Sequence, residues 1–216
     1  MLERMEAFFD ARLDGYDAHM LQTIEGAQQF YPFTARNLPM NKDAAILDLG
    51  CGTGLELEYY FALNPTARVT GIDLAPGMMN ALKEKFPDKQ LHLILGSYFE
   101  VPFGVGQFDG AVSVESLHHF TQEAKIPLYT KLHDALKDGG WFILTDYFAL
   151  SDEEEQHWYQ ELLRLKAENG ITDDGFYHYD TPLTVAHETQ ALTQAGFRRV
   201  EVLRSWESTF TLKAYK

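Results

Sequence analysis

Three glycines at alternate positions, Gly50, Gly52 and Gly54, follow the acidic residue Asp48 at the end of an apolar run. Glycine adopts backbone angles that are closed to other residues, and it lets the main chain approach a ligand with no side chain in the way. A carboxylate two residues before the first glycine is a natural partner for a cationic ammonium group. The sequence therefore predicts a loop that binds a zwitterionic, partly cationic ligand and not a phosphorylated one.

The spacing of the glycines argues against a dinucleotide-binding turn. Such a turn has the pattern G-x-G-x-x-G and places a pyrophosphate at the start of a helix. Here the third glycine comes one residue early, and Leu55 stands where the dinucleotide pattern needs glycine. Asp48 would also lie badly beside a pyrophosphate. A nicotinamide-dependent oxidoreductase is therefore the less favoured function.

A second acid follows at a matching distance. The run from Arg68 to Asp73 is typical of a strand, and it ends in an acid about twenty residues past the glycines. An acid at the carboxyl end of such a strand can accept hydrogen bonds from both hydroxyls of a ribose. Asp73 is therefore a second predicted contact to the same ligand.

The pattern D-x-G-x-G-x-G after a buried strand, with an acid ending the next strand, resembles the class I S-adenosylmethionine (SAM) dependent methyltransferases. The resemblance covers residues 44 to 148 by motif and the C-terminal tail by topology. It implies SAM as the cofactor and S-adenosylhomocysteine as its product. It also implies an α/β fold with a Rossmann-like, doubly wound, seven-stranded sheet, mostly parallel with an antiparallel C-terminal hairpin strand.

The chain length and apolar content favour a single domain over residues 1–216, and the resemblance implies that this domain binds SAM and is a methyltransferase domain. Within it we expect residues 1–38 to form a helical N-terminal cap. Residues 151–183 interrupt the alternation of strands and helices, and they contain the ring side chains Phe176, Tyr177, His178 and Tyr179. These rings predict either a lid over the acceptor site or a cover for the edge of the sheet.

The resemblance carries cofactor-binding roles onto particular residues of this chain. They are Tyr16, Asp48, Gly50, Cys51, Gly52, Gly54, Asp73, Leu74, Met78, Ser97, Tyr98 and Val114. Tyr16 is carried over as an aromatic residue of the cap that closes over SAM, and packing between helices is the alternative role for it. Ser97 stands where the family commonly has an aspartate for the adenine amino group, so this contact is in doubt.

Catalytic candidates follow the fourth predicted strand, residues 108–115. The segment from Ser116 to Phe120 resembles a motif of the small-molecule enzymes of the family, and it contains His118 and His119. Histidine titrates near neutral pH, so these two are the first candidates for a general base. Glu115 is a further candidate, and Asp146 and Tyr147 are reserves. Adjacent side chains usually point apart, so we expect one histidine to face the pocket, with structural roles for both as the alternative.

Methyl transfer from a sulfonium is an in-line displacement, so the protein must hold donor and acceptor collinear and exclude water. No metal ion is required. The chain lacks the Asn-Pro-Pro-Tyr run of enzymes that methylate nucleobase or glutamine amides. We therefore expect methyl transfer to a small-molecule acceptor. An enzyme that remodels SAM itself, as the carboxy-SAM synthases of this superfamily do, is the alternative.

The charge of the chain bears on its partners. The net charge is −14, with 18 Lys and Arg against 32 Asp and Glu, which disfavours nucleic acid as a partner. The sequence has no apolar run of about 18 residues and no basic-then-apolar leader, so we expect no membrane association and a cytoplasmic location. Cys51 is the single cysteine, which excludes an internal disulfide. A homodimer stays open.

Apolar periodicity places the remaining elements. Strands are expected at residues 44–49, 68–73, 91–95, 108–115, 141–146, 199–203 and 209–214. A helix with Ile126 and Leu136 on its apolar face should end with Gly139 and Gly140 as C-cap residues. Another helix is expected over residues 156–168, and the acidic run 152–155 is expected to be a solvated helix start with Ser151 as its cap. The last helix should start near Thr181 or Thr184 and run to Ala195.

Overall fold

A computed structural model describes residues 2–173 and 175–216 of the chain. Met1 and Asp174, which fall in the predicted cap and lid, lie outside the described residues. The strands are β1 (Ala45–Leu49), β2 (Arg68–Asp73), β3 (Gln90–Leu95), β4 (Phe108–Val114), β5 (Leu136–Tyr147), β6 (Arg199–Trp206) and β7 (Thr209–Tyr215). The helices are α1 (Met5–Asp10), α2 (Tyr16–Thr23), α3 (Ala27–Arg36), α4 (Leu55–Leu63), α5 (Pro76–Lys85), η1 (Leu117–His119), α6 (Gln122–Ala135), α7 (Asp152–Glu168) and α8 (Val185–Gln194).

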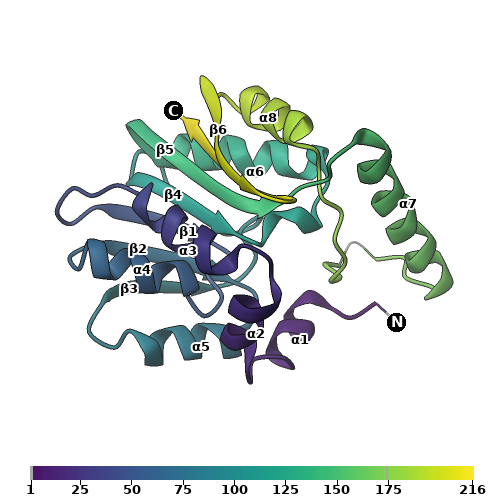
Figure 1. The fold of residues 1–216 in the computed structure, drawn as a ribbon, viewed down its shortest axis with the longest axis horizontal. Coiled ribbons are helices and arrows are strands. Elements are labelled where there is room, and N and C mark those ends of the chain that lie inside the picture. Colours follow the sequence, from purple (N-terminus) through teal and green to yellow (C-terminus); the bar gives the residue numbers. More distant parts are fainter. Residues whose placement is uncertain (1, 174) are drawn as a thin grey trace.

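One seven-stranded sheet has the order β3-β2-β1-β4-β5-β7-β6 (Figure 1). The pairs among β1 to β5 are parallel, whereas β7 is antiparallel to both β5 and β6. The predicted fold class is therefore confirmed. The chain builds outward from β1 to β3 and then returns to place β4 beside β1. Ligands of open α/β sheets bind at such a switch point, outside the carboxyl ends of the strands.

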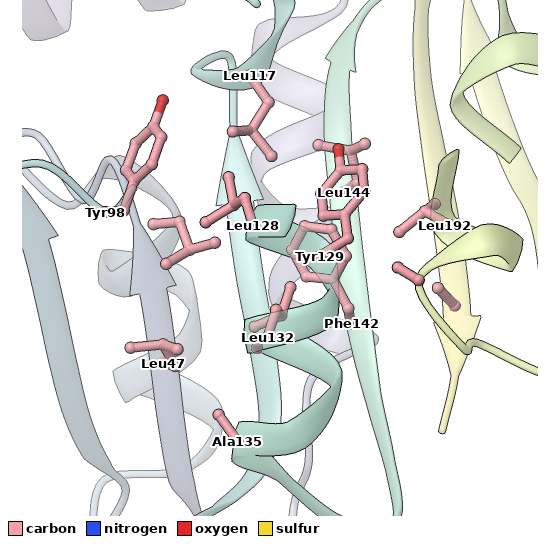
Figure 2. Packing of buried hydrophobic residues seen from close by; sticks show 14 of the residues in the cluster. Leu47, Tyr98, Leu117, Leu128, Tyr129, Leu132, Ala135, Phe142, Leu144 and Leu192 are labelled. Atoms are coloured by element: carbon pink, nitrogen blue, oxygen red, sulfur yellow. The ribbon is translucent and has the colours of Figure 1, made fainter. Parts of the chain in front are cut away.

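Both faces of the sheet are covered, because successive side chains of a strand point to opposite sides. On β1, Ile46 packs with α3 and α4, whereas Leu47 packs with the core beneath α6 and α8. Figure 2 shows Leu47, Leu128 and Phe142 in this second core. The central strands are consequently apolar on both faces, and polar residues that carry chemistry are concentrated at their ends.

Two predicted boundaries are wrong. Helix α6 ends at Ala135, and β5 starts at once with Leu136. Gly139 and Gly140 therefore lie inside β5 and do not cap the helix. Pairing with β4 passes directly from Phe108–Leu136 to Gly110–Trp141, which leaves extra residues on β5 that Gly139 accommodates with a φ of 76°. Apolar spacing alone did not distinguish the last turn of the helix from the first residues of the strand.

Helix α7 begins at Asp152, so the acidic run after Ser151 forms its first turn, as predicted, and continues into the helix expected from Gln156. The predicted cap is confirmed, since the Ser151 hydroxyl accepts a hydrogen bond from the Glu154 N–H at 3.2 Å. For α8 the structure selects Thr184, whose hydroxyl accepts from the His187 N–H at 3.3 Å. Both hydroxyls satisfy amide groups that have no partner within the helix.

The N-terminal segment and the segment before α8 are paired through their backbones. The Met5 N–H donates to the Phe176 carbonyl, and the His178 N–H donates to the Glu3 carbonyl, both at 3.0 Å. Figure 1 shows this pairing beside α1, with α7 projecting away from the sheet. The N-terminal segment and the residues after α7 are therefore joined through their backbones.

Across the described ranges, no helix combines the length and the apolar character needed to cross a membrane.

Candidate active site

The loop after β1 folds back onto the end of β2. The N–H groups of Gly50 and Cys51 both donate to the Ile72 carbonyl, at 2.9 and 3.2 Å. A Cβ added to Gly50 would overlap the Ser116 hydroxyl, whereas one added to Gly52 would meet no atom within 4 Å. Gly50 is therefore needed for close packing of the protein itself. Gly52 instead borders open space in which a ligand would contact the main chain.

Asp73 holds this loop in place. Its two carboxylate oxygens accept hydrogen bonds from the N–H groups of Gly52 and Ala75, each at 2.8 Å. Burial raises the pKa of Asp73, although these amide bonds oppose the effect. Each oxygen keeps a further lone pair, so the group can still accept hydrogen bonds from a ligand.

A narrow cavity lies between this loop and the cap. Its lining is Met5, Phe9, Tyr16, Gly50, Gly52, Asp73, Leu74, Met78, Tyr98, Val114, Glu115 and Ser116, which includes most of the residues predicted to bind the cofactor. The cavity volume is about 60 Å³, well below the roughly 300–1,000 Å³ of ligand pockets. In this arrangement the cavity is therefore smaller than a nucleoside.

The other residues predicted to bind the cofactor do not line this cavity. Gly54 packs against Leu82, and Cys51 is 2% exposed, with the pKa of its thiol raised by burial. Ser97 is buried, and its hydroxyl accepts a hydrogen bond from the Phe99 N–H at 3.2 Å. These positions shape the walls of the site from behind.

Asp48, also outside the lining, is 1% exposed and has no hydrogen-bond partner on either carboxylate oxygen among the described residues. Glu56, in the first turn of α4, is 5% exposed and also has an unpaired carboxylate oxygen. Burial raises the pKa of both groups, and the neighbouring Glu56 raises that of Asp48 further. Unpaired buried carboxyl groups are costly, and an ammonium group would relieve that cost.

A larger cavity of about 860 Å³ opens beside the narrow one. Its lining comes from the cap, from the turn after β4, from the segment before α8 and from the β6–β7 turn. The side chains of the turn and of that segment are Glu115, His118, His119, His178 and Asp180, and the cap adds Phe8, Phe9, Arg12, Tyr16, His19 and Met20. Phe9, Tyr16 and Glu115 line both cavities, so these residues form a shared wall.

Glu115 stands at the end of β4 with a φ of 49°, which is unusual for a residue other than glycine. Its N–H donates to the Thr145 carbonyl at 2.9 Å, which fixes the turn. Burial, together with the charge of Asp146, raises the pKa of Glu115 to about 8. The side chain is thus placed at the junction of the two cavities.

Both histidines face the larger cavity, so the expectation that only one would do so is wrong. His118 and His119 lie in the short 3₁₀ turn η1, with ring centroids 4.0 Å apart. Successive residues of such a turn are rotated by about 120°, not by the half turn of an extended strand. Both rings therefore reach the same side.

Asp146 anchors the first of these rings. Its carboxylate accepts from the Leu117 N–H at 2.8 Å and lies 2.5 Å from Nδ1 of His118. Burial by itself would lower the pKa of His118, but the carboxylates of Asp146 and Asp180 raise it well above its usual range. Conversely, burial and the charge of His118 lower the pKa of His119.

The segment before α8 brings further groups to this turn. The Thr181 N–H donates to the His118 carbonyl at 2.8 Å, which holds the segment against η1. Asp180 consequently lies next to both histidine rings, and the ring of His178 lies 5.0 Å from that of His119. Burial lowers the pKa of His178 to about 4, with the charge of His119 adding to the effect.

Sequence reasoning missed two of these groups. Glu56 carried a signal, because it is an acid between Leu55 and Leu57 in an otherwise apolar helix start. Asp180 carried none, since its contact with η1 joins residues that are far apart in the sequence.

A doubly wound sheet with a glycine loop and a carboxylate at its switch point defines a Rossmann-like domain that binds a nucleoside cofactor. Residues 46–140 match the sequence model of the family described as a methyltransferase domain. Over these residues the chain is a methyltransferase domain, which confirms the predicted resemblance to the class I SAM-dependent methyltransferase superfamily and its cofactor SAM. The unpaired carboxyl groups of Asp48 and Glu56 and the open space at Gly52 fit that cofactor.

Individual relatives differ in length and name. The chain is 30% identical over 164 residues to the biotin biosynthesis bifunctional protein BioHC of Teredinibacter turnerae, a match covering 72% of this chain and 26% of that protein. It is 28% identical over 188 residues to the carboxy-S-adenosyl-L-methionine synthase of Chromohalobacter salexigens, a match covering 80% of this chain and 68% of that protein. The fold matches a Nostoc punctiforme structure described as a candidate O-methyltransferase, with a TM-score of 0.72 at 21% identity; the match covers 99% of this chain and 62% of that one.

Proposed function

We propose that this protein transfers a methyl group from SAM to a small-molecule acceptor. The observation that carries the proposal is the shared wall of Phe9, Tyr16 and Glu115 between the narrow cavity and the 860 Å³ cavity. When bound, SAM supplies a methyl group activated by its sulfonium. An acceptor in the larger cavity would reach that group once Phe9 and Tyr16 move aside, because in-line displacement requires direct contact between acceptor and methyl group.

On the donor side, the cofactor roles follow from charge and open space. Asp48 and Glu56 are proposed to receive the ammonium group, since they are buried and lack partners. Asp73 is proposed to accept hydrogen bonds from the ribose hydroxyls while it keeps its bond to the Gly52 N–H. The rings of Tyr16 and Tyr98 line the same cavity and supply apolar surface for the rest of the nucleoside.

On the acceptor side, Glu115, His118 and His119 are proposed to contact the acceptor, because all three line the larger cavity. Closure follows from the backbone pairing of the cap with the segment before α8. Exclusion of water from the reacting atoms protects the activated methyl group and strengthens polar contacts to the acceptor. The predicted lid role of residues 151–183 belongs to this proposal.

Calorimetry with two nucleosides tests the donor assignment. We expect S-adenosylhomocysteine to bind with micromolar-range affinity, a range typical of many cofactors, and NADH to show no heat of binding. Binding of NADH in preference to S-adenosylhomocysteine would contradict the proposal. Transfer of label from methyl-labelled SAM to a fraction of small acids, phenols or amines then tests the reaction itself.

Remodelling of SAM is a second candidate, favoured by the similarity to the carboxy-S-adenosyl-L-methionine synthase. The two reactions differ in the nucleoside that leaves the enzyme. Mass spectrometry would find S-adenosylhomocysteine after methyl transfer, and a heavier sulfonium nucleoside after carboxylation of the methyl group. Only the first result supports methyl transfer to a separate acceptor.

Nucleic acid is the acceptor class that the charge disfavours. At a net charge of −14 the release of counterions contributes little to association. We expect no gel shift of tRNA or duplex DNA at physiological salt, and a shift at submicromolar protein would overturn the choice of a small-molecule acceptor.

A further inference from the structure

A cavity of about 190 Å³ adjoins the larger one beside α7. We call it the aromatic compartment, and its lining is Tyr147, Trp158, His178, Tyr179 and Asp180. Tyr147, His178 and Asp180 also line the larger cavity, so the two spaces share a wall. The ring side chains come from the end of β5, from α7 and from the segment before α8. Three separate parts of the chain therefore bring aromatic rings to one acid.

The tryptophan of this compartment differs from the other two tryptophans in its surroundings. Nζ of Lys213 lies 3.9 Å from the ring centroid of Trp141, and an arginine guanidinium lies 5.2 Å from that of Trp206. Among the described residues, no lysine or arginine lies over the ring of Trp158 or over the two tyrosine rings of the compartment. Ring faces attract cations within about 6 Å of the centroid. The rings of the compartment are therefore accessible to a cation from outside the chain.

The charges beside the compartment leave a negative balance. Burial would lower the pKa of His118, but Asp146 and Asp180 raise it well above its usual range, so this ring is protonated. Burial would raise the pKa of both carboxyl groups, but their contacts with His118 hold each below its ordinary range. Burial lowers the pKa of His119 and of His178, so these rings are neutral at pH 7. Two carboxylates thus face one imidazolium, and a cation beside Asp180 would balance the remaining charge.

The indole N–H of Trp158 indicates a second property of the ligand. Its Nε1 atom is buried and has no hydrogen-bond acceptor among the described residues. The other two tryptophans donate this N–H to oxygen atoms, at 2.8 and 3.1 Å. A buried donor without a partner costs free energy, and an oxygen of a bound molecule would relieve that cost. The ligand should therefore carry an oxygen close to its cationic nitrogen.

The size of the compartment favours a small head group. Its volume of about 190 Å³ equals that of about six waters in the liquid and is below the roughly 300–1,000 Å³ of pockets for whole ligands. We propose that the aromatic compartment binds a quaternary or tertiary ammonium group that has an oxygen near its nitrogen. The rest of a larger molecule would extend past Tyr147 and Asp180 into the larger cavity. This binding stands independently of the proposed methyl transfer.

Choline and its neutral dimethylbutanol analogue, in which carbon replaces the nitrogen, test the need for charge. In isothermal titration of the full chain without SAM, we expect choline to bind at one equivalent and the alcohol at least about tenfold more weakly. Equal affinity for the two compounds, or no saturable binding of choline below about 10 mM, would overturn the proposal.

Tetramethylammonium tests the need for an oxygen, because it lacks the hydroxyl group of choline. It should bind about 2–10-fold more weakly than choline, as loss of one hydrogen bond predicts. Trp158→Phe keeps a ring and removes the N–H, so this variant should no longer distinguish the two cations. Equal binding of both cations to wild type would contradict the role of the indole N–H.

Three further variants locate the site. Trp158→Leu should weaken choline binding by at least about tenfold, because the ring is lost. Asp180→Asn should weaken binding of choline more than that of the neutral alcohol. Tyr159→Leu is the control, because Tyr159 is the exposed neighbour of Trp158 on α7. Circular dichroism checks that each variant is folded. If Trp158→Leu kept the wild-type affinity, or if Tyr159→Leu lost it, the assignment would be wrong.

Discussion

Two buried acidic sites on opposite faces of the sheet differ in whether the carboxylate has a hydrogen-bond donor. Glu188 of α8 and Asp48 of β1 are each 1% exposed. Glu188 accepts a hydrogen bond from Nζ of Lys125 at 2.6 Å and another from the Tyr129 hydroxyl. Asp48 has no partner among the described residues and faces Glu56, a second acid. Burial alone therefore does not single out a carboxylate, and the proposed role of Asp48 depends on its burial without a hydrogen-bond donor.

The same comparison separates the structural half of the molecule from its binding half. The Lys125–Glu188 pair joins α6 to α8 behind the sheet, where both helices cover one core. Asp48 and Glu56 lie at the switch point of the sheet, on the strand and helix that flank the glycine loop. Charges in the first half are balanced within the protein. In the second half burial raises the pKa of both acids, and a cationic ligand is the partner that we propose for them.

The largest effect is expected from breaking the satisfied pair. Lys125→Met leaves the Glu188 carboxylate buried and unpaired, which should lower the free energy of unfolding by about 3–5 kcal/mol. Urea denaturation at pH 7 measures this. The double variant Lys125→Met, Glu188→Gln should recover most of the loss, because no charge is then left unpaired. A loss below about 1 kcal/mol in the single variant is typical of a solvated ion pair. It would mean that water reaches the Glu188 carboxylate when Lys125 is removed.

On the binding half, Asp73→Ala should weaken S-adenosylhomocysteine binding by about 1.5–3 kcal/mol, because two charge-assisted hydrogen bonds are lost. Asp73→Asn is the matched control, since it keeps the side-chain shape and removes the charge. Calorimetry of both variants separates the carboxylate's bonds to the ligand from its hold on the Gly52 N–H. Wild-type affinity in Asp73→Ala would remove this residue from the cofactor site.

A smaller effect of opposite sign is expected at Asp48. The amide of Asp48→Asn can donate to Glu56, so the ligand-free protein should gain about 1–2 kcal/mol of stability at pH 7 and bind S-adenosylhomocysteine more weakly. Because burial raises the pKa of Asp48, the folded protein keeps the proton of the Asp48 carboxyl group at pH values where the unfolded chain has released it. Wild-type stability should therefore fall as the pH rises above about 4.

Denaturation of wild type and Asp48→Asn across pH 4 to 8 checks this sign. The advantage of the variant should grow with pH, because only wild type carries the raised pKa. A difference that is constant over the range, or a variant less stable than wild type, would show that Asp48 is not an unpaired acid in the folded protein.

The smallest effect is expected in the lid. A ligand that binds only the closed arrangement lowers the population of the open form, which is the form that a protease cleaves. At a ligand concentration ten times the dissociation constant, the population of the open form falls by up to about tenfold. Limited proteolysis near Asn169-Gly170 should therefore slow when S-adenosylhomocysteine is added. Cleavage in an exposed loop on the far side of the sheet, at Gly104-Val105, serves as the control. Equal rates with and without ligand would favour a fixed cover of the sheet edge.

Local patterns predicted which residues meet at the proposed donor half of the site. The glycine loop lies within ten residues of Asp48, and Asp73 ends the next strand, so strand and turn geometry place them together. The boundary between α6 and β5 was predicted wrongly, because the glycine pair at Gly139 lies inside β5 and does not follow the helix directly. A glycine pattern shows that the chain turns but not whether a strand has already begun.

The acceptor half was predictable only in part. His118 and His119 were found from their motif, but their shared orientation depends on a 3₁₀ turn that apolar periodicity does not reveal. Asp180 meets them through the bond from Thr181 to the His118 carbonyl, which depends on how the whole segment packs. Contacts between distant residues of this kind follow from tertiary structure and leave no local signal.

The wall of Phe9, Tyr16 and Glu115 has a consequence for turnover. Because the first two belong to the cap and border both cavities, they cannot swing away from one without also opening the other. S-adenosylhomocysteine and the methylated product would then leave through one motion of the chain. Solvent viscosity slows such a motion. For such an enzyme we expect kcat to fall in proportion to added viscosity from sucrose, and a kcat indifferent to viscosity would assign the slow step to chemistry.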